Sequence, residues 1–249
     1  MFVAGYELFA DYHTHTLHSH GKHSVRENAL AAAEKGLEAV AISDHGPASL
    51  FGVGVRNLDA FLAIRREIEA VQEEHPGVRI LLGVEANVVS PDGELDVPRK
   101  WQERFDVVLA GLHPLVRWRT AREGARLLAL NAGSRLFRRW LAEARAENTR
   151  SLVNAVRKNR VHIVTHPGYR LSVDTRKLAR ACAECGAALE INSGHDHTTE
   201  EDIRIARAEG ATFALGSDAH SKDRVGDLAR AAHMARRAGL ASDAIVNAR

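Results

Sequence analysis

The sequence predicts an α/β fold in which about seven parallel strands form a closed or nearly closed barrel. Apolar, strand-like runs alternate with amphipathic helical runs along the 249 residues, as in proteins built on a parallel sheet. Histidine, aspartate or glutamate follows six of the seven strand-like runs, and a barrel collects residues from many strand ends at one face. No glycine-rich nucleotide-binding motif follows any strand, which argues against a doubly wound sheet.

The strand-like runs are short and apolar, and the helical runs repeat apolar residues at a helical spacing. In chain order, the expected strands occupy residues 7–12, 38–43, 78–86, 106–112, 161–165, 187–192 and 212–217. The expected helices occupy residues 25–35, 58–74, 135–159, 175–185, 199–209 and 226–238.

Local signals indicate where several of these helices begin and end. Ser24, followed by Glu27 three residues later, is typical of an N-terminal capping box, and Thr199 precedes three acidic residues. Glycine follows four helical runs, as expected where a left-handed residue ends a helix: Gly36, Gly186, Gly210 and Gly239.

Length and composition fit one domain over residues 1–249, with a hydrophobic content of 45% for the core. The formal net charge of +2 gives no general affinity for nucleic acid. No apolar run reaches the ~20 residues that span a bilayer, and the N-terminus lacks a signal-peptide pattern. We therefore expect a cytoplasmic protein with no membrane association, and the sequence carries no signal for an oligomeric state.

Residues 115–160 form a strongly basic segment, with 12 Lys or Arg against 3 Glu and a local charge of +9. One interpretation is a solvated helical insertion within the barrel domain. The other is a basic wall that attracts an anionic substrate. His113 follows the fourth predicted strand and belongs to the candidate site at the strand ends. Arg117 and Arg119 lie closest to it in sequence, so we expect these two arginines to reach that site.

Cys182 and Cys185 are the only cysteines. Their spacing is typical of metal or redox motifs, but no second pair exists and the two lie near the end of a predicted helix. We interpret them as ordinary thiols.

Nine residues at or near strand ends are of the types that bind zinc, manganese or iron. His13 and His15 are two positions apart on a strand and so point to one face, as do Asp218 and His220. Nine ligands exceed the need of one ion and suit two or three. The set is His13, His15, His20, His45, Glu85, His113, His166, Asp218 and His220.

A cluster of divalent ions can lower the pKa of bound water towards ~7 and offset charge on phosphoryl oxygens, as hydrolysis of a phosphoester requires. Glu85 can bridge two cations through its two oxygens. His195 and His197 follow the sixth strand and can orient other groups or act on the leaving group. His18 and His23 lie near His20 and are alternative ligands or supporting donors.

At these motifs the sequence resembles the PHP family, named for polymerase and histidinol phosphatase. The resemblance runs in order from about residue 10 to 226. It rests on DYHTHT (11–16) with SHGK (19–22), SDHG (43–46), GVEAN (83–87) with GLH (111–113), THPG (165–168) and GSDAH (216–220).

The resemblance implies a distorted seven-stranded (βα) barrel with three divalent metal ions, commonly zinc, manganese or iron. By the same resemblance, one ion is held by His13, His15, Glu85 and Asp218. A second is held by Glu85, His113 and His166, with Glu85 as the bridge, and a third by His20, His45 and His220. All nine positions are filled, whereas His23 stands where similar sequences often have glycine.

We therefore expect a trinuclear metal-dependent phosphoesterase that hydrolyses phosphomonoesters of small molecules through attack of metal-bound hydroxide on phosphorus. Glu85 would be central, and His195, Arg117 and Arg119 would assist. Histidinol phosphate is one candidate substrate because the family includes that phosphatase. One alternative is an exonuclease or nucleotide phosphodiesterase, although an aromatic content of 5% offers little surface for stacking bases. Another is a non-catalytic, metal-stabilised interaction module.

Overall fold

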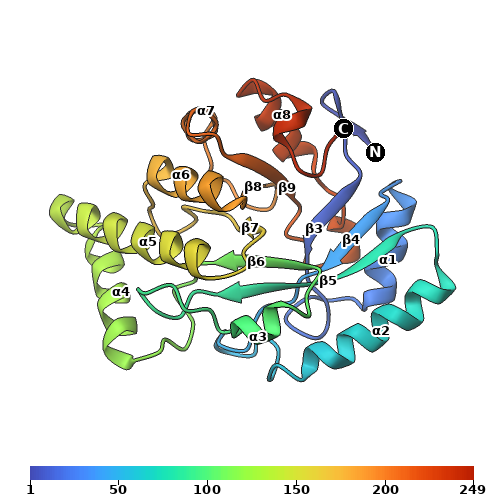
Figure 1. Ribbon diagram of the computed structural model, residues 1–249, viewed down its shortest axis with the longest axis horizontal. Coiled ribbons are helices and arrows are strands. Elements are labelled where there is room, and N and C mark those ends of the chain that lie inside the picture. Colours follow the sequence, from blue (N-terminus) through green and yellow to red (C-terminus); the bar gives the residue numbers. More distant parts are fainter.

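A seven-stranded parallel sheet curls into a nearly closed barrel in the computed structural model, which describes all 249 residues (Figure 1). Neighbours in the sheet follow chain order, which confirms the predicted strands and barrel. The strands are β3 (Ala10–Thr14), β4 (Ala39–Ile42), β5 (Arg79–Asn87), β6 (Val107–Gly111), β7 (Ile163–Val164), β8 (Ala188–Asn192) and β9 (Thr212–Gly216). A separate N-terminal hairpin pairs β1 (Phe2–Val3) with β2 (Tyr6–Glu7).

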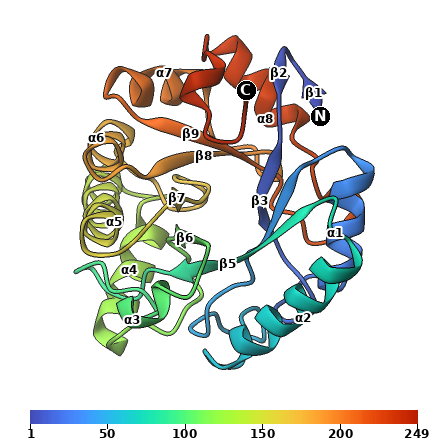
Figure 2. The ribbon, with the colours of Figure 1, turned by 45° about the vertical axis from the view of Figure 1, so that its right-hand side comes forward.

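Eight helices lie around the outside of this sheet (Figure 2). They are α1 (Val25–Glu34), α2 (Ala60–Glu74), α3 (Arg99–Gln102), α4 (Ala121–Gly133), α5 (Arg138–Lys158), α6 (Thr175–Cys185), α7 (Glu200–Ala208) and α8 (Ala229–Arg237). All six predicted helices are confirmed to within a few residues, whereas α3 and α4 were not predicted. None of the eight combines the length and apolar character needed to cross a membrane.

The predicted helix ends agree with the structure. Ser24 and Glu27 form a reciprocal capping box at the start of α1, and Thr199 forms another with Asp202 at the start of α7. Gly186 ends α6 in the left-handed conformation, with φ of 72°. The two cysteines are free and both lie on α6.

The basic segment folds into two helices, where one helix over residues 135–159 was expected. Thr120 caps α4 through a capping box with Glu123, and residues 134–137 connect its end to α5. The two helices pack side by side and project from the barrel (Figure 1). The segment is thus a helical pair on the outside of the domain.

The barrel closes where the first strand of the sheet meets the chain beyond the last. His15 N donates a hydrogen bond to Ala219 O at 2.8 Å, and Ala219 N donates to His13 O at 3.2 Å. These two bonds, which we call the closing seam, lie at the carboxyl ends of the strands. The nearly complete ring of strands therefore joins at the edge where the predicted ligands stand.

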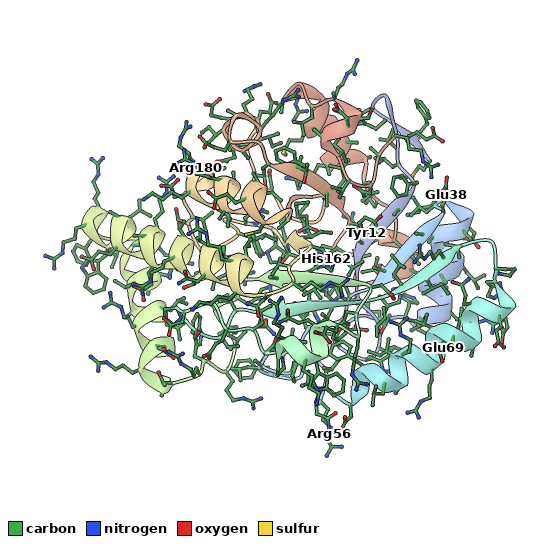
Figure 3. All side chains as sticks on the ribbon, in the orientation of Figure 1. Tyr12, Glu38, Arg56, Glu69, His162 and Arg180 are labelled. Carbon is green, nitrogen blue, oxygen red and sulfur yellow. The ribbon has the colours of Figure 1, made fainter.

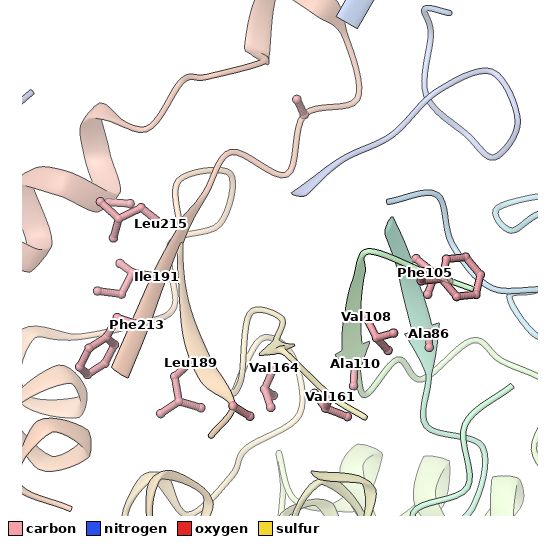
Figure 4. Close-up of a cluster of buried hydrophobic side chains, with 14 of the residues drawn as sticks. Ala86, Phe105, Val108, Ala110, Val161, Val164, Leu189, Ile191, Phe213 and Leu215 are labelled. Atoms are coloured by element: carbon pink, nitrogen blue, oxygen red, sulfur yellow. The ribbon is translucent and has the colours of Figure 1, made fainter. Parts of the chain in front are cut away.

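Two layers of apolar side chains hold the barrel. The outer layer fills the space between sheet and helices, and Figure 4 shows Val108, Val164, Leu189, Ile191 and Phe213 within it. The inner layer forms a floor inside the barrel: Ala41, Leu81, Val107, Leu109, Ile163, Ala188 and Ala214, with Tyr12 packed against them. Successive strand residues face opposite sides of the sheet, so every second residue points into the barrel. Inward residues nearer the carboxyl ends of the strands than this apolar layer can therefore be polar.

Charged side chains such as Arg56, Glu69 and Arg180 lie on the outer surface (Figure 3). His162, by contrast, precedes β7, and its Nδ1 accepts a hydrogen bond from Val108 N at 2.9 Å. This contact gives His162 a structural role at the start of β7, where it holds the neighbouring strand β6.

Candidate metal centre

All nine predicted ligands gather at the carboxyl ends of the barrel strands. His13 belongs to β3 and Glu85 to β5, and the other seven stand in the loops that follow β3, β4, β6, β7 and β9. His13, His15 and Glu85 are at most 1% exposed. The structure therefore brings together residues that lie far apart in the sequence.

Glu85 lies at the middle of this group. Its Oε1 is 2.9 Å from His166 Nε2 and 3.2 Å from His113 Nε2. Its Oε2 is 3.3 Å from His13 Nε2 and 3.0 Å from His45 Nδ1. Each oxygen thus faces a different pair of histidines, which is the arrangement that a bridging carboxylate needs.

Four donor atoms have the spacing that a divalent ion requires. His13 Nε2 lies 3.3 Å from Glu85 Oε2 and 3.5 Å from Asp218 Oδ1. His15 Nε2 lies 3.6 Å and 3.3 Å from the same two oxygens. Ligand atoms about 2.1 Å from a tetrahedral ion are about 3.4 Å from one another, so this set fits an ion such as zinc.

The remaining donors form one continuous set with these four. His20 Nε2 and His220 Nε2 are 2.6 Å apart, and His113 Nε2 and His166 Nε2 are 3.4 Å apart. Three-residue groups with ligand atoms within 4.8 Å of one another also include His15 with His45 and His220, and His45 with Glu85 and His113. These groups overlap, so the division of the nine residues among three ions stays a prediction.

Several of these buried nitrogen and oxygen atoms have no hydrogen-bond partner: His13 Nε2, His15 Nδ1 and Nε2, His45 Nδ1 and Glu85 Oε2. Burying an unpaired polar atom costs about 1–3 kcal/mol, so their convergence calls for a compensating charge. A cation at their centre would satisfy most of them together. The donor set therefore fits divalent metal ions.

The charge states also suit metal binding. Burial lowers the pKa of His45 well below its ordinary value, and burial lowers the pKa of His220 to about 4, so both rings are neutral. Burial opposes protonation of His13 as well, but Glu190, Asp218 and Glu85 outweigh it and raise its pKa well above the usual value. A metal ion can replace this proton, because metal binding and protonation compete for the same ring nitrogen.

A layer of polar residues behind the ligands fixes the orientation of their rings. Glu190, an inward residue of β8, accepts from His13 Nδ1 at 2.7 Å and from His166 N at 2.7 Å. Such contacts set the tautomer that presents Nε2 to a metal. The sequence signal for Glu190 was a single charged residue inside an apolar strand, and sequence reasoning missed it.

His113 is oriented in the same way. Its Nδ1 contacts Asn87 Oδ1 at 2.7 Å, and Asn87 Nδ2 donates to Asp96 Oδ2 at 2.7 Å. A Cβ atom on Gly46 would lie 2.3 Å from Asp96 Oδ2, so the glycine of the SDHG motif makes room for this carboxylate. Neither Asn87 nor Asp96 was predicted.

The loop that carries His20 is held by Asp44. Asp44 Oδ1 accepts from Thr16 N at 2.8 Å and from Ser19 Oγ at 2.5 Å. His18 turns away from the centre and contacts Glu67 of α2 at 2.7 Å. The structure therefore leaves His20 as the ligand candidate of this loop.

His195 lies at the rim of the centre. Its Nε2 is 3.1 Å from Asp218 Oδ2, and its ring stacks on Tyr169 at 3.8 Å. Nearby backbone is strained, because His166, Arg170 and Asp218 have φ of 28°, 60° and 53°. Left-handed non-glycine residues cluster at functional sites, where the surrounding structure stabilises the strain.

An open pocket of about 260 Å³ lies over the centre, and its lining includes His45, Glu85, Tyr169, Arg170 and His195. No arginine of the basic segment lines it.

The structure does not bring Arg117 or Arg119 into this pocket. Arg119 pairs instead with Asp92, Glu94 and Glu123. Arg117 Nη2 donates to Pro47 O at 3.2 Å. These contacts favour the solvated-insertion interpretation of the basic segment, and Arg170 takes the position that had been expected for the two arginines.

Comparison with known proteins identifies the family of this chain. The model of the PHP domain matches residues 11–194. A probable phosphatase of Thermoanaerobacter sp. (strain X514) is 30% identical over 251 residues, covering 97% of this chain and 91% of the relative. A probable phosphatase of Tolumonas auensis is 31% identical, covering 88% of this chain and 80% of the relative.

Two solved structures share the fold at low sequence identity. The histidinol phosphate phosphatase from Lactococcus lactis, complexed with zinc, L-histidinol and phosphate, has a TM-score of 0.56 at 18% identity and covers 94% of both chains. The putative histidinol phosphatase from Listeria monocytogenes has a TM-score of 0.61 at 15% identity, covering 87% of this chain and 97% of the other. Because the PHP domain model matches residues 11–194, which is most of the sequence, this chain belongs to the PHP domain family.

Proposed function

We propose that this chain is a phosphomonoesterase that acts on phosphorylated small molecules and depends on three divalent ions. The observation that carries the proposal is the buried, convergent donor set around Glu85, which opens to a pocket at the barrel mouth. The probable phosphatases among the relatives support the reaction class.

In this proposal, the nine ligands divide as the family resemblance implies, and Glu85 joins two of the three groups. When bound, zinc, manganese or iron ions supply an acidified water molecule and positive charge for the phosphoryl oxygens. Glu190 holds the rings of His13 and His166 in the orientation that this requires.

Two further residues have roles toward the substrate. Arg170 lines the pocket and has no carboxylate partner, so its guanidinium can donate paired hydrogen bonds to the phosphoryl group. His195, fixed between Tyr169 and Asp218, can donate a proton to the leaving oxygen as the ester bond breaks.

The direct test is hydrolysis of p-nitrophenyl phosphate by the purified protein before and after chelation. We expect chelation to abolish activity and zinc, manganese or iron to restore it, together with metal analysis that approaches three ions per chain. Undiminished activity in the metal-free protein would contradict the proposal. Histidinol phosphate belongs in the first substrate panel, because the Lactococcus lactis neighbour was solved with L-histidinol and phosphate.

Replacing Glu85 separates catalysis from a purely structural metal. We expect Glu85→Ala to lose activity while its circular dichroism stays native, whereas unfolding without metal would favour the interaction-module alternative. Glu69→Ala is the matched control, because Glu69 is exposed on α2 and away from the pocket. The exonuclease alternative has no specific support from the basic segment, since its arginines lie outside the pocket.

A further inference from the structure

A second hollow of about 350 Å³ adjoins the metal-centre pocket. The two share His195, Asp218 and His220, so they meet along one wall at the edge of the centre. The rest of the second hollow is lined by Lys22, Gly194, Ser221 and Arg224, with no hydrophobic residue. We call it the side hollow.

The side hollow is positively charged. Lys22 is exposed, and its ammonium has no ion-pair or hydrogen-bond partner, although its backbone N donates to His220 O at 2.9 Å and so places the residue beside the centre. Arg224 pairs with Asp227 at 2.7 Å, but both side chains are more than a third exposed and such pairs are weak in water. Arg224 is therefore available to a second anion.

The one carboxylate in the lining does not cancel this charge. Asp218 Oδ1 is 3.5 Å from His13 Nε2 and 3.3 Å from His15 Nε2, and its Oδ2 faces His195 at 3.1 Å. Its charge is thus directed into the metal centre.

The side hollow lies where the leaving group of a bound phosphate ester would extend from the metal centre. A phosphoryl group bound over Glu85 would occupy the first pocket, and an ester that extended past His195 would enter the side hollow. An aromatic or alkyl group would find no hydrophobic side chain there. An anionic group would find two cations and the Ser221 hydroxyl.

We propose that the preferred substrates are phosphomonoesters whose leaving group carries a second anionic group, either a carboxylate or another phosphate, bound by Lys22 and Arg224. This inference rests on the proposed phosphatase function. The same charges disfavour a cationic leaving group.

The test compares esters that differ in the charge of the leaving group. Glycerol 3-phosphate is neutral there, 3-phosphoglycerate carries a carboxylate, fructose 1,6-bisphosphate carries a phosphate, and phosphoethanolamine carries an ammonium. We expect kcat/KM about tenfold higher for an anionic ester than for glycerol 3-phosphate, and lowest for phosphoethanolamine, since charge-assisted hydrogen bonds are the strong ones. Comparison of the carboxylate with the phosphate identifies which anion the side hollow takes.

Charge reversal provides the second arm. Lys22→Glu with Arg224→Glu should lower the ratio of kcat/KM for 3-phosphoglycerate over phosphoethanolamine at least tenfold. Lys100→Gln on α3 is the matched control, because Lys100 is exposed and lines neither hollow, and it should leave that ratio unchanged. Circular dichroism verifies that the double variant is folded.

Failure of this inference differs from failure of the proposed function. Hydrolysis of all four esters without regard to leaving-group charge would overturn the inference and leave the phosphatase function standing. If no ester is hydrolysed, calorimetry on the zinc-loaded protein still decides. Tighter binding of 3-phosphoglycerate than of glycerol 3-phosphate supports the side hollow, and equal binding overturns it.

Discussion

At the scale of single residues, the residues that converge at the candidate metal centre were predictable, and the residues that orient them were not. His13, His15 and Asp218 stand in short motifs at strand ends, where one strand's pattern is enough to mark them. Glu190 and Asp96 act through partners on other strands and loops, at contacts that only the folded barrel creates. Arg170 was missed because the sequence analysis chose Arg117 and Arg119, which are close to His113 in sequence. Arg170 reaches the pocket only through the fold.

The first prediction concerns Glu190, which contacts the candidate ligands His13 and His166 and does not line the metal-centre pocket. Glu190→Gln keeps the shape of the side chain but removes the charge that orients His13 and His166. We expect metal affinity to fall about 10–100-fold with the fold intact. Competition with a fluorescent chelator measures the affinity, and a wild-type value in the variant would contradict the role given to Glu190.

The second prediction concerns the half-buried residue Asp96, whose carboxylate accepts hydrogen bonds from Ala48 N and Asn87 N. Burial raises its pKa from the ordinary 3.8 to about 6, so the folded protein holds this proton more tightly than the unfolded chain does. The associated stability is fully present below pH 3.8 and is lost as the pH rises through about 6, for a total of roughly 3 kcal/mol.

Asp96→Asn should remove this dependence on pH, although it also loses an acceptor and lowers the absolute stability. Urea unfolding in the presence of chelator between pH 4 and 7 measures how the free energy of unfolding changes with pH in the wild type and in Asp96→Asn. An equal slope in the two proteins would contradict the shift assigned to Asp96.

At the scale of elements, the strands could be predicted because each is a short apolar run that precedes a polar group. The helices with capping and glycine signals were predicted closely, since these signals are local. Of the pair α4 and α5, only α5 was predicted, because the many charged residues of the basic segment obscure the spacing of the apolar positions in α4. The tertiary contact between the two helices decides where the chain turns.

The third prediction concerns the start of α1. Ser24→Ala removes the side-chain acceptor for Glu27 N, one half of the capping box. We expect a loss of about 1 kcal/mol in the free energy of unfolding, measured in urea. Thr199→Ala at the start of α7 should have a similar effect, because the same reciprocal box is present there. A change near zero at both helices would contradict the contribution assigned to the caps.

At the scale of the whole molecule, the barrel floor and the metal centre divide the interior between them. The inner apolar layer stabilises one part of the barrel interior. The part at the carboxyl ends of the strands contains converging carboxylates and imidazoles, and several of their nitrogen and oxygen atoms have no hydrogen-bond partner. An interior built in this way depends on bound cations for part of its stability.

The fourth prediction follows from that dependence. Chelation should lower the Tm by roughly 10 °C, since ions present at 1,000 times their Kd stabilise a protein by about 4 kcal/mol. Thermal scans with chelator, and after zinc is restored, measure the shift. Glu85→Gln should show little response to zinc, and a metal-independent Tm for the wild type would contradict the prediction.

The closing seam has a consequence for how the protein is made. It joins the first strand of the sheet to the loop after the last, so it cannot form until nearly the whole chain has left the ribosome. Until then, His13 and His15 are separated from Asp218 and His220, so the four-residue group of His13, His15, Asp218 and Glu85 is incomplete. The full nine-residue set is therefore assembled only after β9 has been made and the seam has closed.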